Sequence, residues 1–161
     1  MILPSDVKVS TGIYMSASAV DTYTKKSKVV AAVVKKALPE FKNILNLPSS
    51  VTFRVAPIKA RKTNGYYDVD NKLVTIDCRL GWDRALEVMA HELVHAEQYY
   101  TGKLKKKFMN GKGWLHYWNG TPGKKGTTYN AYREQPWEQE AWSRQADLAE
   151  FVCVRLEEKY K

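Results

Sequence analysis

The sequence predicts a single α+β domain, and three observations support this fold class: the order of the elements, the length and the composition. Helix, strand, hairpin, helix, irregular segment and helix follow one another along the chain, an order typical of an α+β fold with a small mixed or antiparallel sheet. The 161 residues suit one domain, 1–161, with one buried core. Hydrophobic residues make up 44% of the chain and charged residues 27%, which excludes wholesale disorder.

The first element is a predicted helix. Apolar residues recur at helical spacing from Val20 to Val34, and Ser16 or Ser18 can cap the helix at its start. Pro39 is expected to stop or kink this helix, with a short helical continuation beyond it.

Three β-rich runs come next, at Val51–Val55, Gly65–Val69 and Lys72–Asp77. Prolines bound the first run on both sides, and its composition is that of a strand. Asp70-Asn71 separates the other two runs and is a turn signal, so these two runs predict a hairpin.

A second helix is predicted over Arg84–Tyr100, with Asp83 as its cap and Gly102 just past its end. The next segment, Gly111–Gly126, is rich in Gly, Lys, Trp and Asn and is expected to be largely irregular. Within it, we expect a short strand or hairpin around Trp114–Trp118, followed by an exposed loop.

The pattern HExxH, formed by His91-Glu92-Leu93-Val94-His95, lies in the middle of the second predicted helix. Residues four apart share a helix face, so His91 and His95 can hold one metal ion together. Two imidazoles at this spacing are typical of a Zn²⁺ site, in which the glutamate takes the proton from the zinc-activated water. The sequence therefore predicts one Zn²⁺ per chain, with Glu92 as the general base.

A catalytic zinc takes three protein ligands and keeps one position open, so a third ligand is needed. The extended pattern HExxHxxGxxH is absent, because Gln98 and Thr101 occupy its last two positions. The only other histidine is His116, in the strand-like segment. The last helix, predicted from Pro136 to about Glu157, offers carboxylates instead.

Glu138 is the better candidate for the third ligand. A rotation of about 100° per residue places it on the apolar, core-facing stripe of the last helix. Glu140 lies on the solvent side, with Arg144 one turn further on as its partner. An inward carboxylate needs a partner, and a metal ion supplies one. We expect Glu138 to be the ligand, with Glu140, Glu134 and His116 as the alternatives.

With these residues in place, the chain resembles the zincin metallopeptidases whose third ligand is a glutamate (gluzincin type), including small bacterial and phage-encoded proteins of the ImmA/IrrE-like and SprT-like kinds. The resemblance runs from about Tyr66 to Val152 and depends on a strand before the HExxH helix, the motif itself, and Glu138-x-x-Ala141. Trp142 follows where related families often have Asp or Asn, and the third histidine and cysteine ribbon of SprT-like proteins are absent. The resemblance implies a zincin-like fold, and it implies that Lys72–Ile76 is the sheet edge with which an extended substrate pairs.

The expected activity is hydrolysis of peptide bonds in a peptide or protein substrate, which makes the protein a metalloprotease. Glu92 takes the proton of the attacking water and later passes it to the leaving amine. One more donor is expected to stabilise the oxyanion, and Tyr132, Tyr129 and His116 are the candidates, with aromatic packing as the other role for each.

The net charge of +9 is unevenly distributed. Gln98–Arg133 contains seven lysines, one arginine and no acid. Within segment 103–118 lysines are mixed with aromatic residues, a composition that binds single-stranded nucleic acid. The alternative function is therefore a nucleic-acid-associated zincin-like protein: a protease that acts on DNA-bound proteins, or a non-catalytic binding or regulatory module. The simpler explanation of this composition is that the lysines keep an exposed, aromatic-rich loop soluble.

The two cysteines, Cys78 and Cys153, form no CxxC pair, which excludes a disulfide scaffold and a cysteine zinc ribbon. No window reaches the ~18 uninterrupted apolar residues of a membrane span. The beginning of the chain carries Asp6 and Lys8 where a signal peptide has an apolar run. These features lead us to expect a cytoplasmic protein without a membrane partner.

Overall fold

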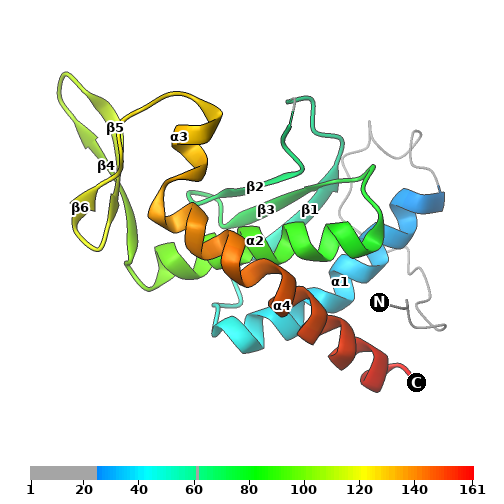
Figure 1. Cartoon of the computed structure of the whole chain (residues 1–161). Helices are drawn as coiled ribbons and strands as arrows, with labels where there is room; N and C mark the ends of the chain where they lie inside the picture. The colour runs from blue at the N-terminus through cyan, green and yellow to red at the C-terminus, as the bar shows by residue number, and fades with distance from the viewer. Residues whose placement is uncertain (1–24, 61) are drawn as a thin grey trace.

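Helix α2 (Trp82–Tyr100) is the element around which the others pack. In the computed structural model, which describes residues 25–60 and 62–161, α2 lies between a small sheet on one side and helices α1 (Lys25–Leu45) and α4 (Pro136–Lys159) on the other (Figure 1). Four helices and two small sheets among the described residues confirm the predicted α+β class. None of the described helices is both long enough and apolar enough to cross a membrane.

The first sheet has the strand order β1 (Thr52–Ala56), β3 (Leu73–Asp77), β2 (Gly65–Asp68). β1 and β3 run parallel, whereas β2 and β3 form the predicted antiparallel hairpin across Asp70-Asn71. Four of the five residues of β3 are buried, as expected for a central strand. The expectation that Lys72–Ile76 forms the sheet edge is therefore wrong, because β1 and β2 flank this strand and are themselves the edges.

Apolar side chains of α1, β1, β3, α2 and α4 form one core. Helix α1 passes through Pro39 and continues to Leu45, so the proline does not stop the helix. On its inner face, Phe41 is completely buried. The expected caps Ser16 and Ser18 lie outside the described residues.

A glycine lies at each end of α2. Gly81 is the N-cap and no side chain caps the helix, so the expectation that Asp83 does so is wrong. Asp83 lies in the first turn instead, where a carboxylate interacts favourably with the helix dipole. At the other end, Thr101 is the C-cap and Gly102 has a φ of 77°, the left-handed conformation that commonly ends helices.

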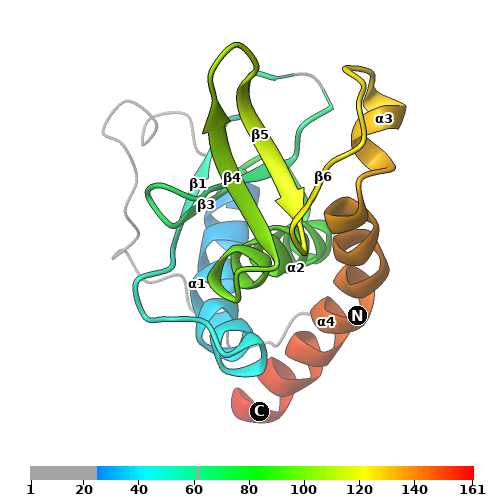
Figure 2. The ribbon, with the colours of Figure 1, turned by 90° about the vertical axis from the view of Figure 1, so that its left-hand side faces the viewer.

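The segment after α2 is more regular than the sequence predicts. It forms a second sheet of β4 (Leu104–Met109), β5 (Gly113–Trp118) and β6 (Thr121–Pro122), in that order (Figure 2). β5 confirms the strand expected around its tryptophans, but β4 was not expected. Only Leu104 of β4 is buried, so the strand has no alternating apolar pattern, and pairing with β5 is what orders it.

A short helix, α3 (Tyr129–Arg133), precedes the last helix and was not expected from the sequence. The Thr128 hydroxyl caps it by accepting a hydrogen bond from the backbone N–H of Ala131. Helix α4 begins at Pro136, as predicted, and packs against both α2 and α1.

A substitution in α1 tests the core. Phe41→Ala removes apolar surface and leaves a cavity, so we expect it to lower the free energy of unfolding by about 3–5 kcal/mol. Urea unfolding followed by circular dichroism measures this change. Phe151 on α4 is 53% exposed, and Phe151→Ala is the matched control, with an expected change below about 0.5 kcal/mol. Equal losses in the two variants would contradict the described core.

Candidate metal centre

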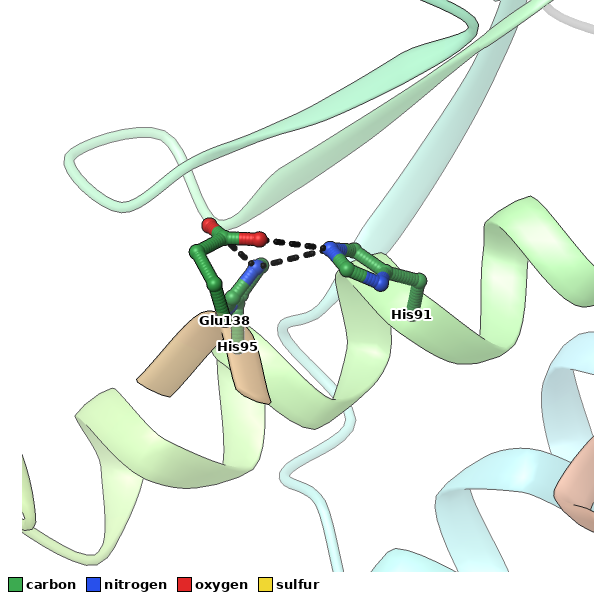
Figure 3. A group of neighbouring side chains, drawn as sticks. All are labelled: His91, His95 and Glu138. Carbon is green, nitrogen blue, oxygen red and sulfur yellow. Dashed lines mark hydrogen bonds and ion pairs between the residues drawn. The ribbon is translucent and has the colours of Figure 1, made fainter. Parts of the chain in front are cut away.

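His91 and His95 project from one face of α2 toward the first turn of α4, where Glu138 lies (Figure 3). All three are buried, with exposed fractions of 7%, 7% and 2%. Pro136 starts α4 just before the glutamate, and the helical repeat then turns Glu138 toward the core, as the apolar stripe predicts. The packing of α4 against α2 thus brings the three expected ligands together.

The ligating atoms of these side chains converge on one point. Glu138 Oε2 lies 3.1 Å from His91 Nε2, and Glu138 Oε1 lies 3.1 Å from His95 Nε2. The two Nε2 atoms are also 3.1 Å apart. Ligands of a tetrahedral Zn²⁺ with bonds of about 2.0–2.1 Å are about 3.3 Å from one another. The spacing therefore fits a single ion bound by all three residues.

Two buried glutamines determine which ring nitrogen of each histidine faces the centre. His95 Nδ1 lies 2.8 Å from Gln98 Oε1, and His91 Nδ1 lies 3.0 Å from Gln145 Oε1. A carbonyl oxygen can only accept, so each Nδ1 carries the proton and donates it. The amide of Gln98 cannot be reversed, since its Nε2 already donates to two oxygen atoms of α4. His95 Nε2 consequently presents a lone pair to the centre, the tautomer that a metal ion requires. The orientation of the Gln145 amide, with Oε1 toward His91 Nδ1, suits the same tautomer of His91.

This donor set fits a cation. Two imidazole lone pairs and a carboxylate that face one another repel, and burying them is unfavourable unless a positive charge lies between them. Nitrogen and oxygen donors suit Zn²⁺, and other divalent metals share this preference. Within residues 25–60 and 62–161, His91, His95 and Glu138 form the one group of three or more His, Cys, Asp and Glu side chains close enough to hold a metal ion.

The carboxylate of Glu138 is prepared to bind a cation. Burial on its own raises the pKa of this group, but without a metal ion the N–H groups that His91 and His95 carry when protonated, together with the nearby Tyr132 hydroxyl, lower the pKa to about 2. Glu138 is therefore negatively charged at neutral pH in spite of its burial.

The alternative third ligands lie outside this group: Glu140, Glu134 and His116. Glu140 instead accepts hydrogen bonds from Gln98 and Lys103. Its expected partner, Arg144, pairs with Glu97 of α2 rather than with Glu140. The solvent-side ion pair expected within α4 is thus replaced by contacts that join α4 to α2 and to the start of β4.

Glu92 lies beside His91, His95 and Glu138 but is not part of the group that could hold a metal ion. It is 8% exposed, and burial raises the pKa of its carboxyl, an effect that the neighbouring His95 and His91 offset in part. The backbone N–H of Tyr67, on β2, faces this carboxylate and also lowers its pKa. A buried carboxylate with a raised pKa next to metal ligands is suited to accept a proton near neutral pH.

The close approach of β2 to Glu92 depends on Gly65. A Cβ atom at this position would lie 2.5 Å from Val88 Cγ1 and 3.5 Å from Glu92 Cγ. The first of these distances is too short for any real side chain, so a larger residue would push β2 away from α2. The missing side chain allows the strand to reach the carboxylate through its backbone.

The remaining candidate residues lie at different places around the centre. Tyr132, on α3, has its hydroxyl close enough to Glu138 to lower the pKa of that carboxylate, and it lines both of the cavities that meet at the centre. Tyr129 lines only the smaller of these cavities. His116, on β5, lines the larger one, with its ring centroid 5.6 Å from that of Trp137. Of the three candidates, only Tyr132 contacts a metal ligand.

Two cavities meet at the centre. The larger, of about 710 Å³, lies between β2, α2, β5, the loop after β6 and the start of α4. The smaller, of about 400 Å³, lies between the loop before β2 and helices α2, α3 and α4. Four residues line both cavities, namely Gly65, Glu92, Tyr132 and Glu138. An elongated molecule that extends from one cavity into the other therefore crosses the metal centre.

Sequence reasoning does not identify three further residues of the site: Gln98, Gln145 and Trp142. Gln98 follows the second histidine by three residues, and Gln145 shares the buried face of α4 with Glu138. A polar residue at a buried helical position is the signal that could have found both glutamines. Trp142 packs against His91, with ring centroids 5.0 Å apart.

The metal content of the purified protein is the first test of this centre. Elemental mass spectrometry should find about one zinc per chain, and His95→Ala and Glu138→Ala should each lose most of it, because each removes one of three ligands. His116→Ala is the matched control and should keep the metal, since it removes the histidine outside the group. Zinc retained in Glu138→Ala but lost in His116→Ala would assign the third ligand to the histidine.

The role of the glutamines predicts a second effect. Gln145→Ala removes the acceptor that orients His91, so the affinity for zinc should fall about 10–100-fold in a competition titration with a chromophoric chelator. The side-chain amide of Gln139, on the same helix, donates to the Arg133 carbonyl rather than to a histidine, so Gln139→Ala should leave the affinity unchanged. If Gln145→Ala binds zinc as tightly as the wild type, the glutamine does not orient the ligand.

Comparison of the chain with family models, with curated proteins and with solved structures found no match. The functional conclusion therefore depends on the geometry of the site itself. That geometry is a buried, convergent donor set of His91, His95 and Glu138, with a separate carboxylate, Glu92, at the junction of two cavities.

Proposed function

We propose that the protein is a zinc-dependent metallopeptidase of the zincin type, with a glutamate as the third ligand. The observation that carries the proposal is the placement of Glu92, a buried carboxylate that adjoins the ligands, is not one of them, and lines both cavities. A site that holds a metal only for structure needs no such base. The HExxH motif on the central helix and the glutamate at the start of the last helix support the same proposal.

His91, His95 and Glu138 are the residues that hold the ion. When bound, zinc supplies Lewis acidity, which lowers the pKa of water and polarises a peptide carbonyl. Gln98 and Gln145 keep the two imidazoles in the ligating tautomer and limit their rotation. The buried position of all these groups strengthens their electrostatic interactions with the reacting atoms.

Glu92 moves the proton in this mechanism. Its carboxylate accepts a proton from the attacking water and donates it to the nitrogen of the leaving amine. Burial raises the pKa of Glu92, which brings it nearer to neutral pH and suits it to both transfers. The N–H of Tyr67 faces the carboxylate and favours its ionised form, which is the form that accepts the proton.

Tyr132 is the best placed of the candidate donors to the developing oxyanion. Burial and the charge of Glu138 raise the pKa of its hydroxyl, so it stays protonated and can donate at neutral pH. Tyr129 and His116 each line one cavity and are assigned to substrate contact rather than to the reacting carbonyl.

Strand β2 is the edge with which an extended substrate pairs in this proposal. The backbone N–H of Asp77 donates to the carbonyl of Asn64 across the hairpin. Antiparallel strands alternate between hydrogen-bonded and non-hydrogen-bonded pairs, so Gly65 directs its N–H and C=O, and Tyr67 its C=O, away from β3 and toward a substrate. The Tyr67 N–H also points away from β3 but faces Glu92. Gly65 and Tyr67 both line the larger cavity, so a peptide on this edge lies alongside the ligands.

Replacement of the proposed base separates chemistry from metal binding. Glu92→Gln keeps a side chain of the same size but cannot accept the proton, so kcat on fluorescently labelled casein should fall about 10²–10⁴-fold while the zinc content is retained. Glu87→Gln, on the same helix but outside both cavities, is the control and should keep full activity. Full activity of Glu92→Gln would refute this mechanism.

The contact of β2 with α2 gives a prediction for Gly65. In Gly65→Ala the new Cβ collides with Val88 and displaces β2 from α2, and with it the strand that packs beside Glu92. We expect kcat to fall at least about tenfold, because small displacements of catalytic groups are costly, with the zinc content unchanged. Kinetics and elemental analysis of the same preparation measure both effects. An unchanged kcat would show that this close approach is not needed.

A further inference from the structure

The two cavities contain basic residues on both sides of the metal centre. Lys124 and Lys125 line the larger cavity, and Lys62 and Arg84 line the smaller. Among the described residues, the only carboxylates in either lining are Glu92 and Glu138, which belong to the candidate metal centre. The charge of a bound divalent ion balances these two carboxylates, so a molecule in the cavities meets a positive potential.

Among the described residues, three of the four basic side chains that line the cavities form no salt bridge with the protein's own carboxylates. Lys103 and Lys159 each form a salt bridge with a glutamate, and Arg84 does so with Glu87. Within the part of the chain that the structure describes, no salt bridge is formed by Lys62, Lys124 or Lys125. Their charges are therefore available to a ligand.

A buried glutamine positions the backbone that carries Lys124. Gln135 is 6% exposed; its Oε1 accepts a hydrogen bond of 2.9 Å from the N–H of Lys124, and its Nε2 donates one of 2.9 Å to the carbonyl of the same residue. The preceding Gly123 lies against Trp137, where a Cβ atom would be 2.5 Å from Cη2. Since Gln135 precedes Glu138 by three residues, these contacts fix the start of the lysine side chain relative to the ligands.

The β4–β5 hairpin continues the same wall outward from the cavity. Its register pairs Lys106 with His116 and Phe108 with Trp114, so the four side chains share one face. His116 and Trp114 line the larger cavity, and Lys106 Nζ lies 4.8 Å from the centroid of the Trp114 ring. Phe108 and Trp114 are each 60% exposed on this hairpin, which projects away from α2 (Figure 2). The cavity thus opens onto a face with one more ammonium group and two exposed rings.

We propose that the substrates of this centre are acidic polypeptide segments, with Asp or Glu side chains on both sides of the scissile bond. The identity of the reaction rests on the proposed peptidase function, whereas the charge selectivity rests on the cavities alone. Substrate carboxylates pair with Lys62 on one side and with Lys124, Lys125 and Lys106 on the other. The intervening apolar groups contact the exposed rings of the hairpin.

The position of the cations favours a polypeptide over single-stranded nucleic acid. They are not confined to the outer hairpin, because Lys62, Lys124 and Lys125 line the cavities that converge on the metal ligands. The larger cavity is also bounded by β2, an edge strand of the sheet that the described residues form, and such an edge offers the hydrogen-bonding groups that a peptide backbone pairs with.

Binding without turnover tests the inference. Zinc-loaded Glu92→Gln protein is titrated at low salt with three fluorescein-labelled probes: a peptide of alternating Glu and Leu, the same peptide with Gln for each Glu, and oligothymidylate. Measured by fluorescence anisotropy, the Glu peptide should bind at least about tenfold more tightly than the Gln peptide, and added salt should reduce this difference in affinity.

The double substitution Lys124→Gln/Lys125→Gln, made in the Glu92→Gln protein, should remove most of this preference. The matched control, Lys28→Gln/Lys161→Gln, changes two exposed lysines outside the cavities and should retain it.

Several outcomes would overturn the inference. One is equal affinity for the Glu and Gln peptides, and another is an equal effect of the cavity and control substitutions. Tighter binding of oligothymidylate that depends on Lys124 and Lys125 would assign these cations to nucleic acid. Because these titrations need no hydrolysis, they are independent of the proposed function. A wild-type protein that selects the Glu peptide but hydrolyses neither it nor casein would refute the peptidase and leave the acidic-ligand site in place.

Discussion

The hydrogen bonds of Gln98 are the interaction on which the site depends. This completely buried side chain accepts from His95 Nδ1 and donates to the Trp137 carbonyl and to Glu140. It therefore joins the helix that carries the two histidines to the first turn of the helix that carries Glu138. A buried amide with every partner in place favours one register of the two helices, because a slip of α4 would leave polar groups unpaired in the core. The spacing of the three ligands follows from that register.

The same arrangement couples metal binding to folding. His91, His95 and Glu138 are buried next to a largely aliphatic core, and their ligating atoms face one another at 3.1 Å. The glutamines satisfy the outer nitrogens of the rings, but the inner lone pairs need a cation. An ion that binds only the folded chain contributes its binding free energy to stability, so the centre stabilises the packing of α2 against α4 that creates it.

The cavities are lined by several helices and strands, and their walls therefore differ in how firmly they are packed. One wall is the edge of the first sheet, which packs on α2 and shares the main core. The opposite wall is β5 of the second sheet, whose partner β4 has Leu104 as its only buried residue. A wall with so few buried contacts opens at a lower free energy than the core does. The centre thus combines a rigid floor, which orients the ligands, with one wall that can adjust to a bound chain.

Sequence alone was sufficient for the features that depend on local periodicity. A spacing of four places His91 and His95 on one helix face whatever surrounds them, and the apolar stripe of α4 distinguishes Glu138 from Glu140. Asp70-Asn71 likewise specifies the hairpin from the residues of the turn.

Strand order has no such local signal in the sequence. β3 is central because β1, from an earlier segment, pairs parallel with its other side, and this contact moved the sheet edge to β2. The lysine-rich β4, the glutamines that orient the histidines, and the convergence of basic residues on the cavities were likewise decided by tertiary structure, because each depends on contacts between segments that are distant in the chain.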